Sequence, residues 1–171
     1  MFAADPMIPL AAAVLHSGPA EPERVLEIEC GAGDGALFLA REFPRARVRG
    51  VDASAEAVAR ARARVGLDPE GRIAFKQGSP RRLPFPADHF DLVVQTAGRP
   101  RIGEAARVLR SEGRLILVHG ERPRDRSGLR RKLTARRLAS AGFEPLQEGG
   151  AGGGSFLVAG RRLPDAAARG A

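Results

Sequence analysis

The residues best suited to chemistry form a glycine-rich turn within the stretch VLEIECGAGDGALFL, residues 25–39. Gly31, Gly33 and Gly35 follow an apolar, strand-like segment and precede a helix-like one. Glycine adopts backbone angles that other residues avoid, and it lets a ligand lie directly against the main chain. So bare a backbone at the end of a strand indicates a site where a small molecule contacts the chain.

Two carboxylates flank this turn. Glu27 stands just ahead of it, and Asp52 ends the next strand-like segment, 19 residues after Gly33. A carboxylate in the position of Asp52 can accept hydrogen bonds from both hydroxyls of a ribose. The negative charge of Glu27 suits a cationic amino group. From spacing alone, the leading interpretation is therefore an adenosine-type cofactor.

Two other interpretations of the turn stay open. The letters GAGDGA, residues 31–36, also fit the dinucleotide pattern G-x-G-x-x-[GA] of nicotinamide and flavin enzymes. Glu27 opposes this interpretation because its charge would repel a pyrophosphate. The downstream strands also show no second mononucleotide-binding half of obvious size. The third interpretation is a tight turn that binds nothing.

The other reactive side chains form no recognisable nucleophilic triad or metal-ligand pattern, so the sequence assigns no catalytic residue and no metal. His119 ends a strand on the ligand side of the expected sheet and is the one histidine that we consider as a base, although a structural role is the simpler reading. We expect no chemical role for His16 or His89. Cys30 is the single cysteine, so an internal disulfide is excluded. We expect Cys30 to be a small buried residue of the turn.

Positive charge is concentrated in one segment. The formal net charge is +8, and residues 122–137 hold eight basic residues against Asp125. A solvated helix face is the simpler interpretation of this segment. If it meets an anionic acceptor, Arg122 and Arg124 are the contacts to test. The chain has no Trp or Tyr, so platforms for base stacking are scarce and nucleic acid is a lesser alternative.

Strands and helices that must position these residues alternate along the chain. We expect strands at 24–29, 47–52, 72–77, 90–95 and 114–120, and helices at 35–43, 55–65, 102–110 and about 127–141. Two last strands, 142–147 and 155–161, are expected to pair as an antiparallel hairpin across the flexible segment EGGAGGG. The alternation predicts a mostly parallel sheet that helices cover on both faces.

Length and composition favour one folded domain. The chain has 171 residues, of which 43% are hydrophobic, and no low-complexity tract. We divide it into an N-terminal segment (1–23), a main domain (24–162) and a flexible tail (163–171). No Lys or Arg precedes residue 24, and prolines interrupt the first apolar run. The sequence therefore predicts neither a signal peptide nor a membrane span, and a cytoplasmic location is expected.

Four stretches resemble, in order and spacing, the class I S-adenosylmethionine-dependent methyltransferases, close to the methyltransferase type 11 group. They are VLEIECGAGDG (25–35), VRGVDAS (48–54), LPFPADHFDLVV (83–94) and EAARVLRSEGRLILV (104–118). The resemblance covers roughly residues 24–120. It implies an α/β fold with a Rossmann-like, doubly wound sheet of seven strands, mostly parallel, with an antiparallel C-terminal hairpin.

The resemblance also implies roles for individual residues toward S-adenosylmethionine. Glu27 would face the methionine amino group, Asp52 would take the ribose hydroxyls, and Gln95 would lie near the methionine end and the acceptor. The other residues implied at the cofactor are Glu29, Gly31, Ala32 and Gly33 in the turn, and Ala53, Gly78 and Ser79 near the adenine.

This sequence departs from the family's pattern at three places. Glu29 stands where the first glycine of the turn is usual, so its carboxylate would either crowd the cofactor or attract its positive charge. The letters GSP at 78–80 replace Gly-Asp-Ala, and Ser79 and Pro80 offer fewer hydrogen bonds to adenine. About two helical turns are missing after the strand at 90–95, in a stretch that helps to wall the acceptor pocket in relatives.

The function implied by the resemblance is in-line methyl transfer from S-adenosylmethionine to an unidentified, small or anionic acceptor. The driving force of such a displacement lies in the cofactor, and the protein mainly aligns the reacting atoms. The alternative is a non-catalytic domain of the same fold that binds S-adenosylmethionine or serves as a scaffold. The sequence leaves the acceptor and the oligomeric state open.

Overall fold

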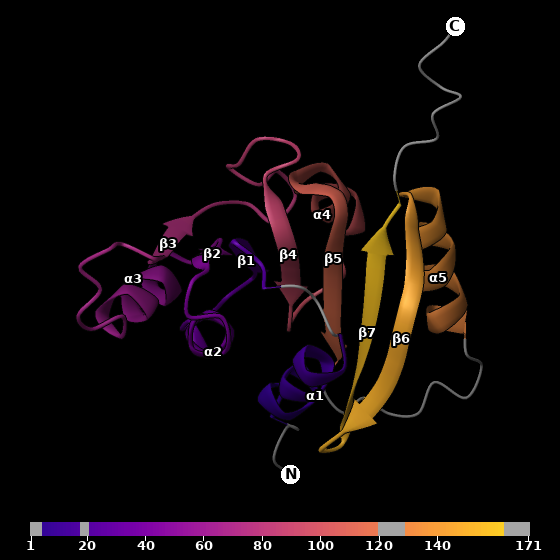
Figure 1. The fold of residues 1–171 in the computed structure, drawn as a ribbon, viewed down its shortest axis with the longest axis horizontal. Coiled ribbons are helices and arrows are strands. Elements are labelled where there is room, and N and C mark those ends of the chain that lie inside the picture. Colours follow the sequence, from indigo (N-terminus) through magenta and orange to yellow (C-terminus); the bar gives the residue numbers. More distant parts are fainter. Residues whose placement is uncertain (1–4, 18–20, 120–128, 163–171) are drawn as a thin grey trace, which may run out of the picture.

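A central sheet organises the part of the chain that the structure, a computed structural model, describes: residues 5–17, 21–119 and 129–162. Its strands are β1 (Arg24–Ile28), β2 (Arg47–Asp52), β3 (Ile73–Gln77), β4 (Phe90–Gln95), β5 (Leu109–His119), β6 (Phe143–Ala151) and β7 (Gly154–Arg161). They lie in the order β3-β2-β1-β4-β5-β7-β6 (Figure 1). β1 to β5 pair in parallel, and β7 is antiparallel to both of its neighbours. The expected sheet and hairpin are confirmed.

Helices cover both faces of this sheet. They are α1 (Met7–Ser17), α2 (Asp34–Glu42), α3 (Ala55–Ala63), α4 (Ile102–Val108) and α5 (Leu129–Ser140). Successive side chains of a strand point to opposite faces, so the core divides into two clusters. Val25 packs in the cluster of α1, α2 and α3, whereas Leu26 and Ile28 pack in the cluster of α4 and α5.

Several expected boundaries were wrong. The strand expected at 114–120 begins at Leu109, and the helix expected at 55–65 ends at Ala63. The helix expected at 102–110 ends at Val108, because Leu109 has an extended backbone and begins β5. The glycine-rich segment 148–154 is not a flexible connection: β6 continues to Ala151 and β7 starts at Gly154. Glycine has no side chain, and this allows β6 to pair closely with β7. A Cβ on Gly149 would overlap the ring of Phe156 on the neighbouring strand.

α1 was not expected from the sequence. The carboxylate of Asp5 accepts a hydrogen bond from the N–H of Met7 at 2.9 Å, and Pro9 falls in the first turn, where a proline is tolerated. Leu10 and Ala13 are fully buried in the same cluster as side chains of β5 and β7. The N-terminal apolar run therefore belongs to the core of the sheet.

The carboxyl ends of β1, β2 and β4 meet at one edge of the sheet. Ile28 lies opposite Val51 on one side and Gln95 on the other, which brings the glycine turn, Asp52 and the end of β4 together. The basic segment lies only partly within the described chain, since Arg122 and Arg124 fall outside it. Of the helices in the described ranges, none has both the length and the apolar character to span a membrane.

Candidate cofactor site

The glycine turn between β1 and α2 is held by main-chain hydrogen bonds. The N–H of Gly33 donates to the carbonyl of Cys30 at 2.9 Å, and the N–H of Cys30 donates to the carbonyl of Val51 at 3.1 Å. Gly31 and Gly33 have φ of 53° and 87°, in the left-handed region that favours glycine. The turn therefore depends on glycine at these positions.

Glu27 is buried beneath this turn, with 1% of its surface exposed. Its Oε1 accepts a hydrogen bond from the hydroxyl of Thr96 at 3.2 Å, whereas its Oε2 has no partner among the described residues. A Cβ on Gly35 would overlap the carboxyl group, so the third glycine makes room for this side chain. A buried oxygen without a donor is costly, which makes Oε2 a suitable acceptor for a cationic group.

The environment of Glu27 changes its protonation. Burial raises the pKa of its carboxyl group from 4.5 to about 8, against the lowering effect of the nearby Ala36 main chain and of the hydrogen bond from Thr96. Near neutral pH the group therefore retains its proton. A cation placed against Oε2 would favour the charged form and release that proton.

Asp52 connects the turn to the second strand. Its Oδ2 accepts a hydrogen bond from the N–H of Gly31, and its Oδ1 accepts one from the N–H of Ser54, both at 2.9 Å. Each carboxylate oxygen keeps a second lone pair. Asp52 can therefore hold the turn and still accept hydrogen bonds from a ligand. Ser54 caps α3, because its hydroxyl accepts a hydrogen bond from the N–H of Ala57 at 3.2 Å.

The residues implied near the adenine lie beside Asp52. The N–H of Gly78 donates to the carbonyl of Asp52 at 2.9 Å, and the amide of Gln77 donates to the carbonyl of Ala53 at 3.2 Å. The hydroxyl of Ser79 accepts a hydrogen bond from the N–H of Arg81 at 3.2 Å, so it shapes its own turn. The structure therefore brings Ala53, Gly78 and Ser79 to the same edge as the glycine turn.

Glu29 and Gln95 form a contact that sequence reasoning missed. Glu29 has φ of 58°, unusual for a residue with a side chain, and its carboxylate accepts a hydrogen bond from the amide of Gln95 at 2.5 Å. A Cβ on Gly98 would overlap this carboxylate. The side chain of Glu29 thus turns toward the loop after β4, and it joins the ends of β1 and β4.

Gln95 organises that loop. It is 3% exposed; its Nε2 lies 2.9 Å from the carbonyls of Ala97 and Arg99, and its Oε1 accepts from the N–H of Arg101 at 3.0 Å. No pattern in the sequence indicated these contacts, because the partners are main-chain atoms of an irregular loop. Thr96, the partner of Glu27, was also missed, because their side-chain contact joins residues 69 positions apart in the chain.

We predict that Gln95→Ala lowers the free energy of unfolding by about 2 to 3 kcal/mol, because it leaves several buried polar groups without partners. Urea denaturation followed by circular dichroism measures this change. Gln147→Ala, on the edge strand β6, is the matched control and should cost less than about 0.5 kcal/mol. Equal losses in the two variants would contradict the role given to Gln95.

Cys30 and His89 both lie among apolar neighbours in the structure. Cys30 is buried as predicted, and burial, with the Glu27 and Asp52 carboxylates, raises the pKa of its thiol to about 12, which leaves it uncharged. His89 stacks on Phe85 and meets Phe90 edge to face, and burial lowers its pKa. Within the described ranges, no three His, Cys, Asp or Glu side chains gather as metal ligands do.

Known proteins are similar to this chain in sequence and in fold. Residues 25–113 match the family described as "Methyltransferase domain". A fatty-acid O-methyltransferase of Mycolicibacterium smegmatis is 38% identical over 111 residues, 61% of this chain and 39% of that protein. A demethylmenaquinone methyltransferase of Deinococcus radiodurans is 34% identical over 126 residues, 70% of this chain and 49% of that protein. This chain therefore spans half or less of the length of these two relatives.

A solved structure extends the likeness to nearly the whole fold. The crystal structure of a SAM-dependent methyltransferase from Aquifex aeolicus superposes with a TM-score of 0.72 at 18% identity, covering 91% of this chain and 90% of that one. The fold of this chain is therefore that of a known methyltransferase. The chain belongs to the methyltransferase domain family.

Proposed function

We propose that this chain binds S-adenosylmethionine at the edge formed by β1, β2 and β4 and transfers its methyl group to a small acidic acceptor. The observation that carries the proposal is the Glu27 carboxyl group, buried beside the glycine turn with Oε2 lacking a partner in the described chain. A cationic amino group supplies what this oxygen lacks. The residues present therefore fit the cofactor.

The remaining residues would bind and orient the same molecule. Asp52 would accept hydrogen bonds from the ribose hydroxyls, and the main chain of Gly31, Ala32 and Gly33 would lie against the methionine portion. Ala53, Gly78 and Ser79 would border the adenine. Glu29 and Gln95 would hold the loop after β4 in place at the methionine end, through their hydrogen bond.

The bound cofactor supplies an electrophilic methyl group on a sulfonium, so the chain itself mainly has to align donor and acceptor. A general base is needed only for an acceptor that is protonated at working pH. The sequence assigns no catalytic base, and a carboxylate acceptor needs none. Both points support an acidic acceptor, as do the cationic residues of α5 and a relative named for fatty acids. We further propose that the reaction takes place in the cytoplasm, where the Cys30 thiol stays reduced.

The experiment begins with calorimetric titration of the protein with S-adenosylmethionine and S-adenosylhomocysteine. We expect micromolar binding of both ligands. Incubation with methyl-labelled S-adenosylmethionine and a panel of carboxylic acids, quinols and phenols then tests transfer. Label in an acid supports the proposal, and label in a quinol alone corrects the acceptor class.

The second candidate function is a non-catalytic domain that binds S-adenosylmethionine as a sensor or scaffold. The short α4 favours it, because only seven helical residues follow the loop after β4 and little chain is left there to enclose an acceptor. Binding without transfer to any member of the panel would favour this candidate. Absence of binding would reject the cofactor site itself.

A further inference from the structure

A groove of about 760 Å³ runs between α4 and α5, on the sheet face opposite α2. Pro80 and Arg81 of the loop after β3 line it, and so do Pro100 and Arg101 of the loop after β4. It contains none of the residues assigned above to the cofactor. Its volume lies in the ordinary range of small-molecule sites.

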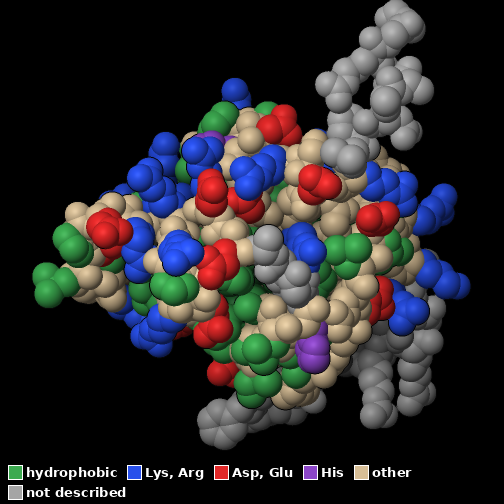
Figure 2. Space-filling view, viewed as in Figure 1, with side chains coloured by type: hydrophobic (Ala, Val, Ile, Leu, Met, Phe, Trp, Pro, Cys, Tyr) green, Lys and Arg blue, Asp and Glu red, His purple; other side chains and the backbone are tan. Residues whose placement is uncertain are grey.

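Four arginines give this groove its charge: Arg81, Arg101, Arg136 and Arg137. Among the described residues, none of these four guanidinium groups forms an ion pair. The Nε of Arg101 is buried and has no hydrogen-bond partner there. Figure 2 shows Lys and Arg side chains gathered at the edge of the molecule over α5. A buried donor without an acceptor indicates a place for an external anion.

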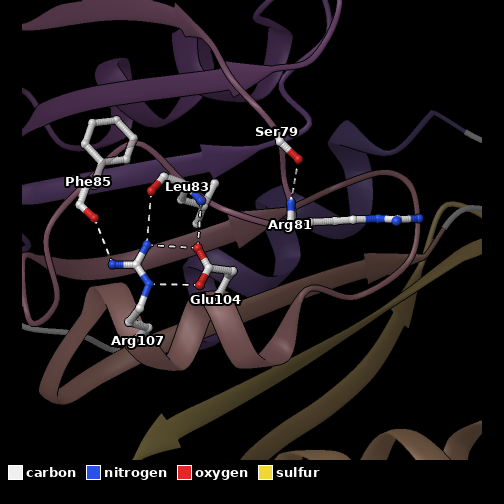
Figure 3. A network of polar contacts seen from close by, with 6 residues as sticks. All are labelled: Ser79, Arg81, Leu83, Phe85, Glu104 and Arg107. Atoms are coloured by element: carbon white, nitrogen blue, oxygen red, sulfur yellow. Dashed lines mark hydrogen bonds and ion pairs between the residues drawn. The ribbon is translucent and has the colours of Figure 1, made fainter.

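Glu104, the one carboxylate among the described residues that line the groove, does not balance this charge. Glu104 accepts hydrogen bonds from Nε and Nη2 of Arg107, both at 2.8 Å, and from the N–H of Leu83 at 2.6 Å. This pairing holds the pKa of Glu104 below its usual range. Figure 3 shows the Arg81 side chain extending away from the Glu104–Arg107 pair, with only its main-chain N–H bonded, to Ser79. Glu104 is therefore neutralised by Arg107, and the four arginines are left without a counter-charge.

Apolar side chains separate the arginines. Ile102 of α4 and Leu133 of α5 both line the groove; Ile102 is 5% exposed, whereas Leu133 is 44% exposed although it is a large aliphatic residue. Guanidinium groups bind carboxylate and phosphate oxygens in pairs of hydrogen bonds, and aliphatic walls bind hydrocarbon. Among the described residues that line the groove none is aromatic, so they offer no platform for nucleic-acid bases.

We propose that the α4–α5 groove binds a small amphiphilic anion, in which a carboxylate or phosphate head group meets the arginines and a hydrocarbon body lies along Ile102 and Leu133. The shared chemistry of these ligands is an anionic head on an apolar chain. The groove adjoins the cofactor site, because Ser79 and Gln95 bond the main chains of Arg81 and Arg101. None of the cofactor residues lines it, so the proposal does not require methyl transfer.

The test uses octanoate, octyl phosphate and neutral 1-octanol, titrated into the full chain at low salt. Wild-type protein should bind one or both anions at least about tenfold more tightly than 1-octanol, because the head group gains charge-assisted hydrogen bonds. The tighter of the two anions identifies the head group. The double variant Arg136→Glu/Arg137→Glu should lose at least about tenfold in affinity for that anion.

Lys132→Glu is the matched control, because it reverses a charge on the same helix outside the groove. It should bind the anions nearly as wild type does. Retained S-adenosylmethionine binding in every variant shows that the fold and the cofactor site survive. A failure of the proposed cofactor site is thereby distinguished from a failure of the groove to bind the anion. Equal affinity for 1-octanol and the anions overturns the proposal. Undiminished anion binding by the double variant, or displacement of the anion by a single-stranded oligonucleotide at lower concentration, also overturns it.

Discussion

Asp52→Ala should lower the affinity for S-adenosylmethionine by at least about a hundredfold, because two charge-assisted hydrogen bonds to the ribose are lost. The same change removes the acceptors of the Gly31 and Ser54 N–H groups. The free energy of unfolding should therefore fall by about 1 to 3 kcal/mol. Calorimetric titration and urea denaturation measure the two effects.

Asp52→Asn separates binding from folding. The asparagine side chain keeps one oxygen that can accept from the Gly31 N–H, so the turn should persist while the affinity falls by about tenfold. Glu70→Gln, an exposed loop residue, is the charge-loss control and should leave both quantities unchanged. Asp52→Ala protein that folds and binds S-adenosylmethionine within threefold of wild type would rule out the ribose role.

Glu27→Gln should change how stability depends on pH. Burial raises the pKa of Glu27 to about 8 in the folded protein, whereas in the unfolded chain the carboxyl group titrates near 4.5. Between these values the unfolded state has lost the proton and the folded state keeps it. The contribution of Glu27 to stability is therefore present below about pH 4.5 and falls by about 1.4 kcal/mol per pH unit until about pH 8.

Urea denaturation of wild type and Glu27→Gln at several pH values between about 5 and 8 measures this slope. The variant should lose the pH dependence that Glu27 causes, whatever its absolute stability. Glu42→Gln, exposed at the end of α2, is the control and should keep the wild-type slope. Identical slopes in wild type and Glu27→Gln would contradict the raised pKa.

The same group predicts proton release on cofactor binding. A cationic amino group against Oε2 would favour the charged carboxylate, so near pH 7 the wild-type protein should release close to one proton per S-adenosylmethionine bound. Titrations in phosphate and Tris buffers, which differ in ionisation heat, measure this number. Glu27→Gln should release none, and a wild-type protein that releases none would argue against Glu27 as the partner of the cation.

Sequence periodicity predicted the sheet well because strand and helix repeats are local properties. The strands expected at 47–52 and 90–95 have those bounds in the structure, because such patterns depend on a few neighbouring residues. Segment 148–154 was misjudged because its strand character depends on Phe156 and the pairing with β7. α1 was missed because it is stabilised by burial against distant strands.

The sequence by itself determined the glycine turn, the carboxylates Glu27 and Asp52, and the order of elements that places them at one edge of a parallel sheet. Only the tertiary structure decided what their surroundings do to them. In the folded chain Glu27 is buried with an unpartnered oxygen, and Glu29 accepts a hydrogen bond from Gln95. Four arginines line a groove in which Glu104 is already paired with Arg107. Burial, pKa and charge balance arise from residues far apart in the chain, which no local pattern brings together.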